Sequence, residues 1–142
     1  MRSLLDVNVL VALFDRNHAL HRQARSWFEE HANHGWASCP ITQNGCVRIL
    51  SQPAYPQHMP VASVIERLRK ATAHPAHAFW HDDASVLDDG EIDATRIHGP
   101  AQLTDVYLLA LAVAHGGRLV TLDQSIPLPA VRGAQKKHLE LI

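Results

Sequence analysis

The sequence predicts an α/β fold in which helices pack against a small, mainly parallel sheet. Short apolar runs that suit buried strands alternate with longer segments of helical periodicity along all 142 residues, and this alternation is typical of parallel sheets. One helix is predicted to be central, because the segment from Val106 to Ala114 is apolar or aromatic throughout and a helix that is hydrophobic on every side belongs inside a domain. Acidic residues follow two of the predicted strands, at the positions where α/β proteins collect ligands.

The first part of the chain contains two predicted strands and two helices. A strand over Arg2–Leu5 ends in Asp6 and passes directly into a helix that begins at Val7. Apolar residues then recur at helical spacing from about residue 20 to residue 33. A second short strand is predicted over Trp36–Cys39.

Two further helices are predicted in the middle of the chain. Pro40 and Thr42 open the first of them, with Thr42 as its N-cap, and its inward face is expected to consist of Gly45, Cys46, Ile49 and Leu50. Three prolines interrupt residues 51–60, which we expect to be a connector. The second helix spans residues 62–73 and is expected to face the core with Val64, Ile65 and Leu68.

The last part of the chain carries the remaining strands around the central helix. A strand is predicted over residues 78–81, and Asp82 and Asp83 are expected to cap a short helical turn that ends at Leu87. Thr104 is expected to be the N-cap of the central helix, which places Asp105 in its first turn. Gly116 and Gly117 end this helix, after which we expect a buried strand over 118–122 and an edge strand over 138–142.

The composition indicates a single soluble domain in a reducing compartment. The length of 142 residues is that of one ordinary domain, and the two cysteines are too few for a disulfide framework. We expect no signal peptide and no membrane span, and therefore a cytoplasmic protein. The formal charge of −1 argues against a protein that coats nucleic acid by bulk charge, so any polyanion must be bound by a local patch.

Three acidic residues from distant parts of the sequence are predicted to meet at one edge of the sheet. Asp6 and Asp123 follow strands, and Asp105 begins a helix; taken singly, each has a structural role available as a cap, a turn residue or a partner of the helix dipole. Two carboxylates about 4 Å apart repel by roughly 4 kcal/mol at an effective dielectric constant near 20, and a proton or a cation must relieve that repulsion. An all-oxygen site suits Mg²⁺, with Mn²⁺ as a substitute.

Four segments of the sequence carry motifs in a fixed order: Asp6–Leu10, the helix opened by Thr42 and continued through Val47–Leu50, Leu103–Ala112 and Leu119–Asp123. These segments resemble the motifs of PIN-domain proteins, and in particular those of the VapC-type ribonuclease toxins of bacterial toxin–antitoxin pairs. The resemblance spans nearly the whole chain, and its motifs occur in the expected order. The ordered set is fairly specific.

The resemblance implies a three-layer α/β/α sandwich that forms one PIN-like domain over residues 1–142, with a magnesium site and the cleavage of RNA phosphodiester bonds. By motif matching, Asp6 and Asp105 are implied to be the principal metal ligands and Asp123 an outer or second-metal carboxylate. Three polar residues are implied to support them: Asn8, Thr104 and Thr121. The implied partners are RNA and a small cognate antitoxin.

The third helix departs from the family pattern at one position. Many relatives carry a Glu three residues after the Thr that opens this helix, and this chain has Gly45 there. Asn44 offers a neutral oxygen in place of that carboxylate, which would leave the site one charge short. Arg48 lies one turn further along and is a candidate to hold a substrate phosphate or the carboxylate cluster, with an ordinary surface position as the alternative.

Other functions remain open at this point. A PIN-like module with weakened or absent nuclease activity would bind RNA or protein without cutting it, and metal titration would distinguish it from a nuclease. A phosphoacceptor domain is disfavoured because no Lys lies near the end of the last internal strand, and the eleven histidines form no recognisable zinc pattern. We also expect a homodimer, because Trp36, Trp80 and the segment 61–68 offer apolar surface.

Overall fold

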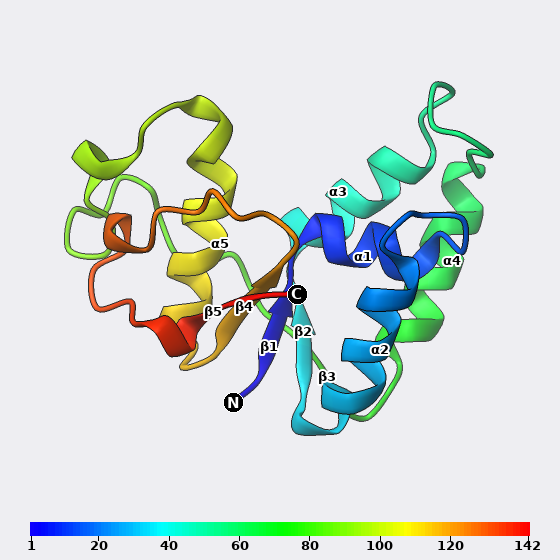
Figure 1. Cartoon of the computed structure of the whole chain (residues 1–142), viewed down its shortest axis with the longest axis horizontal. Coiled ribbons are helices and arrows are strands. Elements are labelled where there is room, and N and C mark those ends of the chain that lie inside the picture. Colours follow the sequence, from blue (N-terminus) through cyan, green and yellow to red (C-terminus); the bar gives the residue numbers. More distant parts are fainter.

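A computed structural model describes all residues, 1–142, as a three-layer α/β/α sandwich (Figure 1). The middle layer is one five-stranded sheet with the order β3-β2-β1-β4-β5, and every neighbouring pair of strands is parallel. This confirms the predicted fold class. The strands are β1 (Ser3–Leu5), β2 (Trp36–Ser38), β3 (His77–Phe79), β4 (Arg118–Thr121) and β5 (Leu139–Leu141).

Five α-helices form the two outer layers, four on one side of the strands and one on the other (Figure 1). None of them has the length and apolar character that crossing a membrane requires. Five short 3-10 turns complete the structure, at Ala32–His34, Ala94–Arg96, Pro100–Gln102, Leu128–Ala130 and Lys136–His138. The helices are α1 (Val7–Phe14), α2 (His21–His31), α3 (Pro40–Leu50), α4 (Val61–Thr72) and α5 (Leu103–Ala114).

Successive residues of the strands point to opposite faces of the sheet and build two separate cores. Leu4 and Leu119 pack in the core beside α5, whereas their neighbours Leu5 and Val120 pack in the core beside α1 to α4. In α5, every residue from Val106 to Ala112 is buried, as the uninterrupted apolar run predicts.

The strand order changes direction between β1 and β4. From β1 the chain continues to β2 and β3 on one side, and later to β4 and β5 on the other. Crevices at the carboxyl ends of the strands form at such a switch point in open α/β sheets. Leu5 is paired with Val120, so Asp6 lies beside Thr121 at this edge.

Three predicted helix starts differ from the structure. Thr42 lies inside the first turn of α3, where its Oγ1 accepts a hydrogen bond from the N–H of Cys39 at 3.0 Å. Thr104 is not the N-cap of α5, because the helix continues from the 3-10 turn at Pro100–Gln102 and begins at Leu103. No helical turn follows Asp82 and Asp83, since the Asp83 carboxylate faces His115 Nε2 at 3.0 Å instead of capping the chain.

Three predicted burial assignments also differ. Ile65 was expected in the core and is 40% exposed, whereas Trp36 and Trp80 were expected to offer surface and are 3% and 7% exposed. Trp80 belongs to the apolar core beside α5, and its ring stacks on His115 with centroids 4.5 Å apart. The remaining predicted strands and helices are confirmed to within about two residues at each end.

Gly45 lies at a tight contact between α3 and α1. A Cβ built there would lie 2.7 Å from Cγ2 of Val7, the residue that follows Asp6. The glycine therefore lets the two helices touch directly beside the sheet edge. No side chain fits at this position without moving Val7, so the carboxylate that many relatives carry here has no room in this packing.

We expect Gly45→Ala to destabilise the protein by about 1 to 3 kcal/mol because it overpacks this contact. Chemical denaturation monitored by circular dichroism measures the change. Gly99→Ala is the matched control, since a Cβ at Gly99 meets no atom within 4 Å. Equal stabilities of the two variants would contradict the close contact between α1 and α3.

Candidate metal centre

Asp6 is the most deeply buried acidic residue at the switch point. It follows β1 and is the N-cap of α1, and its side chain is 4% exposed. Its Oδ1 accepts a hydrogen bond from the N–H of Val7 at 2.7 Å, and its Oδ2 accepts one from the Thr121 hydroxyl at 2.7 Å. Burial raises the pKa of Asp6 despite these hydrogen bonds, and the charge of Asp123 raises it further.

Asn8 and Thr121 hold Asp6 in place. Thr121 ends β4, and its buried Oγ1 also accepts hydrogen bonds from the Asn8 side-chain amide at 3.3 Å and from the N–H of Asp123 at 3.0 Å. The side-chain oxygen of Asn8, Oδ1, in turn accepts a hydrogen bond from the N–H of Leu122 at 3.2 Å. These contacts fix the orientation of the Asp6 carboxylate, because the Thr121 hydroxyl that donates to it also accepts hydrogen bonds from Asn8 and Asp123.

Asp123 begins the loop after β4 and is fixed by Ser125. Its Oδ1 accepts hydrogen bonds from the Ser125 N–H at 2.8 Å and from the Ser125 hydroxyl at 2.7 Å. These donors favour the ionised carboxylate and lower the pKa of Asp123. Asp123 therefore contributes a permanent negative charge to the site at neutral pH.

Asp105 lies in the first turn of α5 and is half-buried. Burial raises the pKa of Asp105 to about 7, with further contributions from the negative charges of Asp6 and Asp123 and from a side-chain hydrogen bond to Asp123. The three carboxyl groups are therefore close enough to sense one another electrostatically. A proton on Asp105 partly relieves their repulsion at neutral pH.

The donor chemistry of this site fits a hard divalent cation. Carboxylate, hydroxyl and amide oxygens are available, and no Cys or His takes part, which favours Mg²⁺ or Mn²⁺ over softer metals. No three acidic, His or Cys side chains lie close enough together to enclose an ion directly, because Asp6 is bound to Thr121 and Asp123 is turned toward Ser125. A cation that keeps several of its waters, as Mg²⁺ commonly does, matches such a set of donors.

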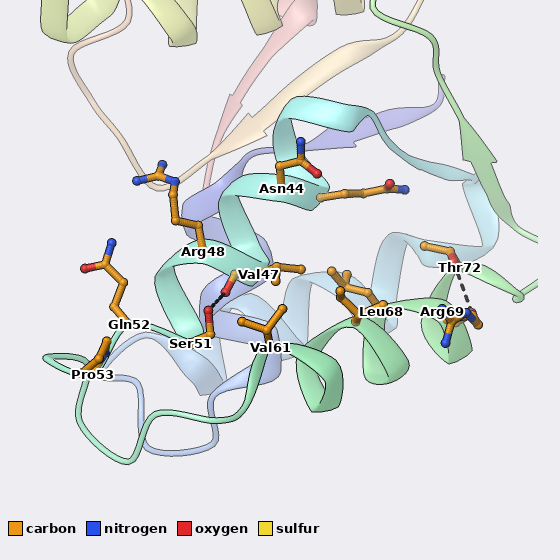
Figure 2. Close-up of a pocket in the computed structure, with 12 residues that line it drawn as sticks. Asn44, Val47, Arg48, Ser51, Gln52, Pro53, Val61, Leu68, Arg69 and Thr72 are labelled. Atoms are coloured by element: carbon orange, nitrogen blue, oxygen red, sulfur yellow. Dashed lines mark hydrogen bonds between the residues drawn. The ribbon is translucent and has the colours of Figure 1, made fainter.

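The other residues suggested by the sequence lie outside this hydrogen-bonded network. Thr104 is exposed on α5 and makes no side-chain hydrogen bond, while Asn44 and Arg48 are exposed on α3. Asn44 and Arg48 line a groove of about 860 Å³ between α3 and α4 (Figure 2). The apolar side chains of the groove are Val47, Val61, Ile65 and Leu68.

Two residues at this edge were missed by the sequence analysis. Ser125 binds Asp123, and its spacing of two residues after an Asp is a local signal for such a turn. Gln102 binds the backbone of Ser125 from a position 23 residues earlier in the chain. No local pattern predicts that contact, since it depends on how α5 packs beside the loop that follows β4.

Comparisons with known proteins agree with the resemblance read from the motifs. A family model described as "PIN domain" matches residues 3–131. The chain is 58% identical over 139 residues to "Ribonuclease VapC44" of Mycobacterium tuberculosis, and the aligned region covers 98% of each chain. It is 39% identical over 134 residues to "Ribonuclease VapC39" of the same species, and that aligned region covers 94% of this chain and 96% of the relative.

A solved structure shares the fold. It is described as "Crystal structure of VapBC2 from Rickettsia felis bound to a DNA fragment from their promoter", and it superposes with a TM-score of 0.68 over 100% of this chain and 99% of the matched chain. The sequence identity is 15%, so this similarity concerns the fold alone.

We expect Asp105→Asn to stabilise the metal-free protein at pH 8. The raised pKa of Asp105 means that folding binds a proton between about pH 4 and pH 7, so the stability of the wild type falls as pH rises through this interval. Asn has no such dependence. After allowance for solvent exposure and for the lost interaction with the helix dipole, we expect a net gain of about 1 kcal/mol at pH 8.

Thermal melting in EDTA at several pH values measures this difference, which should shrink toward zero or reverse below pH 4. Asp82→Asn serves as a control, because Asp82 is exposed and is not one of the groups that raise the pKa of Asp105. A variant Asp105→Asn that melts below the wild type at pH 8 would show that Asp105 acts mainly through the helix dipole.

Proposed function

The chain belongs to the PIN-domain family and is similar to its VapC ribonucleases, and on that premise we propose that it is a divalent-metal-dependent endoribonuclease and the toxin of a toxin–antitoxin pair. The observation that carries this proposal is the half-buried Asp105, whose pKa is raised to about 7 beside Asp6 and Asp123. A folded protein that retains such repulsion gains most from binding a cation. Mg²⁺ is the proposed ion, and Mn²⁺ is expected to substitute for it.

Asp6, Asp105 and Asp123 are the proposed metal ligands. A bound divalent ion at this position would lower the pKa of a coordinated water and offset the charge of a phosphodiester. Thr121 and Asn8 orient Asp6, and Ser125 keeps Asp123 ionised by donating to its Oδ1. Hydrolysis would form a bond between this water oxygen and phosphorus and would break a P–O bond of the RNA backbone, and the proton released by the water would neutralise the leaving oxygen.

A second candidate function is a PIN-like module that binds RNA or protein with weakened or absent nuclease activity. The observation that favours it is the contact between Gly45 and Val7, which leaves no room for a further carboxylate on α3. Asn44, the residue before Gly45, is exposed and offers only a neutral oxygen. The site consequently holds three carboxylates. A site that binds a divalent cation favours the nuclease, and one that binds none favours the module that does not cleave RNA.

We expect Mn²⁺ to raise the melting temperature of the wild type and to support cleavage of a labelled RNA, and we expect Asp105→Asn to abolish both effects. The substitution removes a ligand charge while preserving shape, so the variant should still fold. Asp82→Asn is the matched control and should behave as the wild type. Cleavage that survives Asp105→Asn, or a wild type that folds but neither responds to Mn²⁺ nor cuts, would contradict the nuclease proposal.

The groove between α3 and α4 is the surface that we propose for the antitoxin. Its polar rim includes Arg48 and Arg69 (Figure 2). Arg69 is paired with Glu66, which does not line the groove, so Arg48 supplies its unpaired positive charge. Val61 and Ile65 are 53% and 40% exposed along its apolar side. An amphipathic segment with acidic residues on its polar face fits this combination. We further propose that a basic side chain of the same partner reaches the carboxylates in place of the metal.

We also propose a homodimer. Trp36 and Trp80 are buried, and the exposed side chains of the segment 61–68 line the groove that we propose for the antitoxin, so the homodimer proposal rests on other exposed apolar side chains. They are Phe79, Leu87 and Leu103, which are 46%, 90% and 43% exposed.

We expect expression of the chain alone to arrest growth, and coexpression of the small protein encoded beside its gene to relieve the arrest. Ile65→Glu should preserve toxicity and abolish the relief, because it places a negative charge in the groove. Leu20→Glu is the matched control, since Leu20 is 38% exposed and lies outside the groove. Relief that is equal for both variants would exclude the groove as the antitoxin site.

A further inference from the structure

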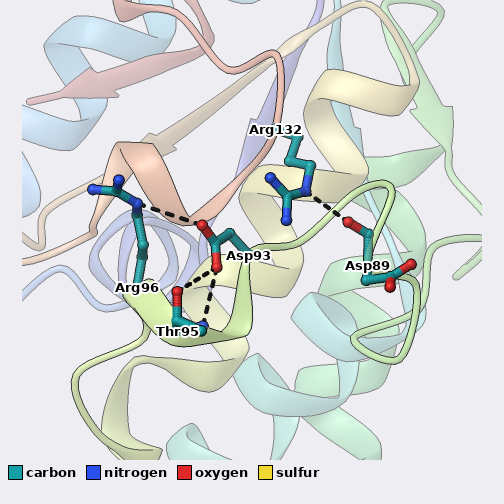
Figure 3. A network of polar contacts seen from close by, with 5 residues as sticks. All are labelled: Asp89, Asp93, Thr95, Arg96 and Arg132. Carbon is teal, nitrogen blue, oxygen red and sulfur yellow. Dashed lines mark hydrogen bonds and ion pairs between the residues drawn. The ribbon is translucent and has the colours of Figure 1, made fainter.

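The segment before α5 and the segment after β4 are joined at several points along their length. Ile92 and Val131 form an antiparallel bridge, and Ile92 is 2% exposed. The Arg132 guanidinium donates to the carbonyl oxygen of Asp89 at 2.6 Å (Figure 3), and the N–H of Asp93 donates to the carbonyl oxygen of Ala130 at 2.9 Å. These contacts hold the two segments together away from the acidic edge.

Asp93 adds a local contact to this network. Its carboxylate accepts hydrogen bonds from Thr95 and is paired with Arg96 at 3.4 Å, which fixes the 3-10 turn that leads toward α5 (Figure 3). The network therefore orders the approach to α5. It does not itself touch the carboxylates of the candidate site.

Gln102 makes the link between the two segments that lies nearest to the carboxylates. Its Nε2 donates to the carbonyl oxygen of Ser125 at 3.0 Å, and its Oε1 accepts from the N–H of His98 at 2.9 Å. Ser125 in turn donates twice to Asp123, while Asp105 follows Gln102 by three residues on α5. The Gln102 amide thus connects the element that carries Asp105 with the loop that carries Asp123.

Gln102 directly precedes α5, but its side chain does not bind the first turn of that helix. Helix N-caps favour Ser, Thr, Asp or Asn, whose short side chains bind the free N–H groups of the first turn. Gln102 makes no such bond. Its amide oxygen binds His98, four residues earlier, and its amide nitrogen binds Ser125 in the segment after β4. Its length serves to reach Ser125 rather than to start the helix.

We propose that Gln102 is a positioning residue that sets the separation of Asp105 and Asp123. This inference rests on the proposed function, because the separation matters only if the two carboxylates act on one divalent cation. Outer contacts that orient metal ligands commonly change metal affinity by about 10-fold to 100-fold when removed. Gln102 contacts Ser125, which holds Asp123, and it directly precedes the first turn of α5, which carries Asp105.

Two substitutions of Gln102 test whether its amide group must reach Ser125. Gln102→Met preserves the length of the side chain and removes both hydrogen bonds. Gln102→Asn keeps the amide group and is too short to reach Ser125. Gln124→Met is the matched control, because Gln124 is exposed in the same loop and makes no side-chain hydrogen bond.

We expect both Gln102 variants to bind Mn²⁺ about tenfold more weakly than the wild type in calorimetric titration. With Mn²⁺ and a labelled random-sequence RNA, kcat should fall while KM stays constant, since Gln102 is not proposed to contact RNA. In the metal-free protein, the backbone amide of Ser125 should exchange its hydrogen faster, while the amides in the middle of α5 should be unchanged.

The outcomes distinguish this inference from the proposed function. If the wild type binds Mn²⁺ and cuts RNA while the Gln102 variants match Gln124→Met in affinity and kcat, the positioning role is wrong and the nuclease proposal stands. If Gln102→Asn binds Mn²⁺ as tightly as the wild type, the reach of the side chain to Ser125 does not control metal binding and the positioning role is wrong. A wild type that binds no Mn²⁺ and cuts no RNA overturns the proposed function and this inference with it.

Discussion

The parallel pairing of β1 with β4 is the constraint on which the rest of the structure depends. It places the end of each strand at the point where the sheet changes direction, so that Asp6 and Thr121 meet although they lie 115 residues apart in the sequence. The hydrogen bond between them is buried and links the first helix to the loop that carries Asp123. Apolar packing on both faces of these strands makes the pairing rigid, because Leu5 and Val120 are fully buried.

This rigidity explains why the repulsion among the carboxylates is retained. Asp6 has no room to move away from the site because it is buried and bound on both oxygens. Asp105 stands on a helix that is enclosed by the core, and Asp123 is bound by Ser125. The fold therefore maintains a negative potential at one edge, which binding of a proton or a cation relieves.

Local patterns predicted much of this arrangement. The apolar run of α5, the short strands before Asp6 and Asp123 and the rule that parallel strands end at a common edge suffice to bring the three acids together. The pattern could not predict that α5 begins through a 3-10 turn, or that Asp83 pairs with His115 instead of starting a helix. The contacts of Gly45 with Val7 and of Gln102 with Ser125 also depend on tertiary packing between distant segments.

Locating Mn²⁺ in crystals of the protein tests most directly whether the carboxylates at the switch point bind a divalent cation. Anomalous scattering identifies the position of the ion independently of activity. We expect one or two peaks among Asp6, Asp105 and Asp123, with Asp105 ionised. A fully folded protein whose crystals, soaked in Mn²⁺, show no peak at these residues, or show peaks only elsewhere, would contradict a metal site at the switch point.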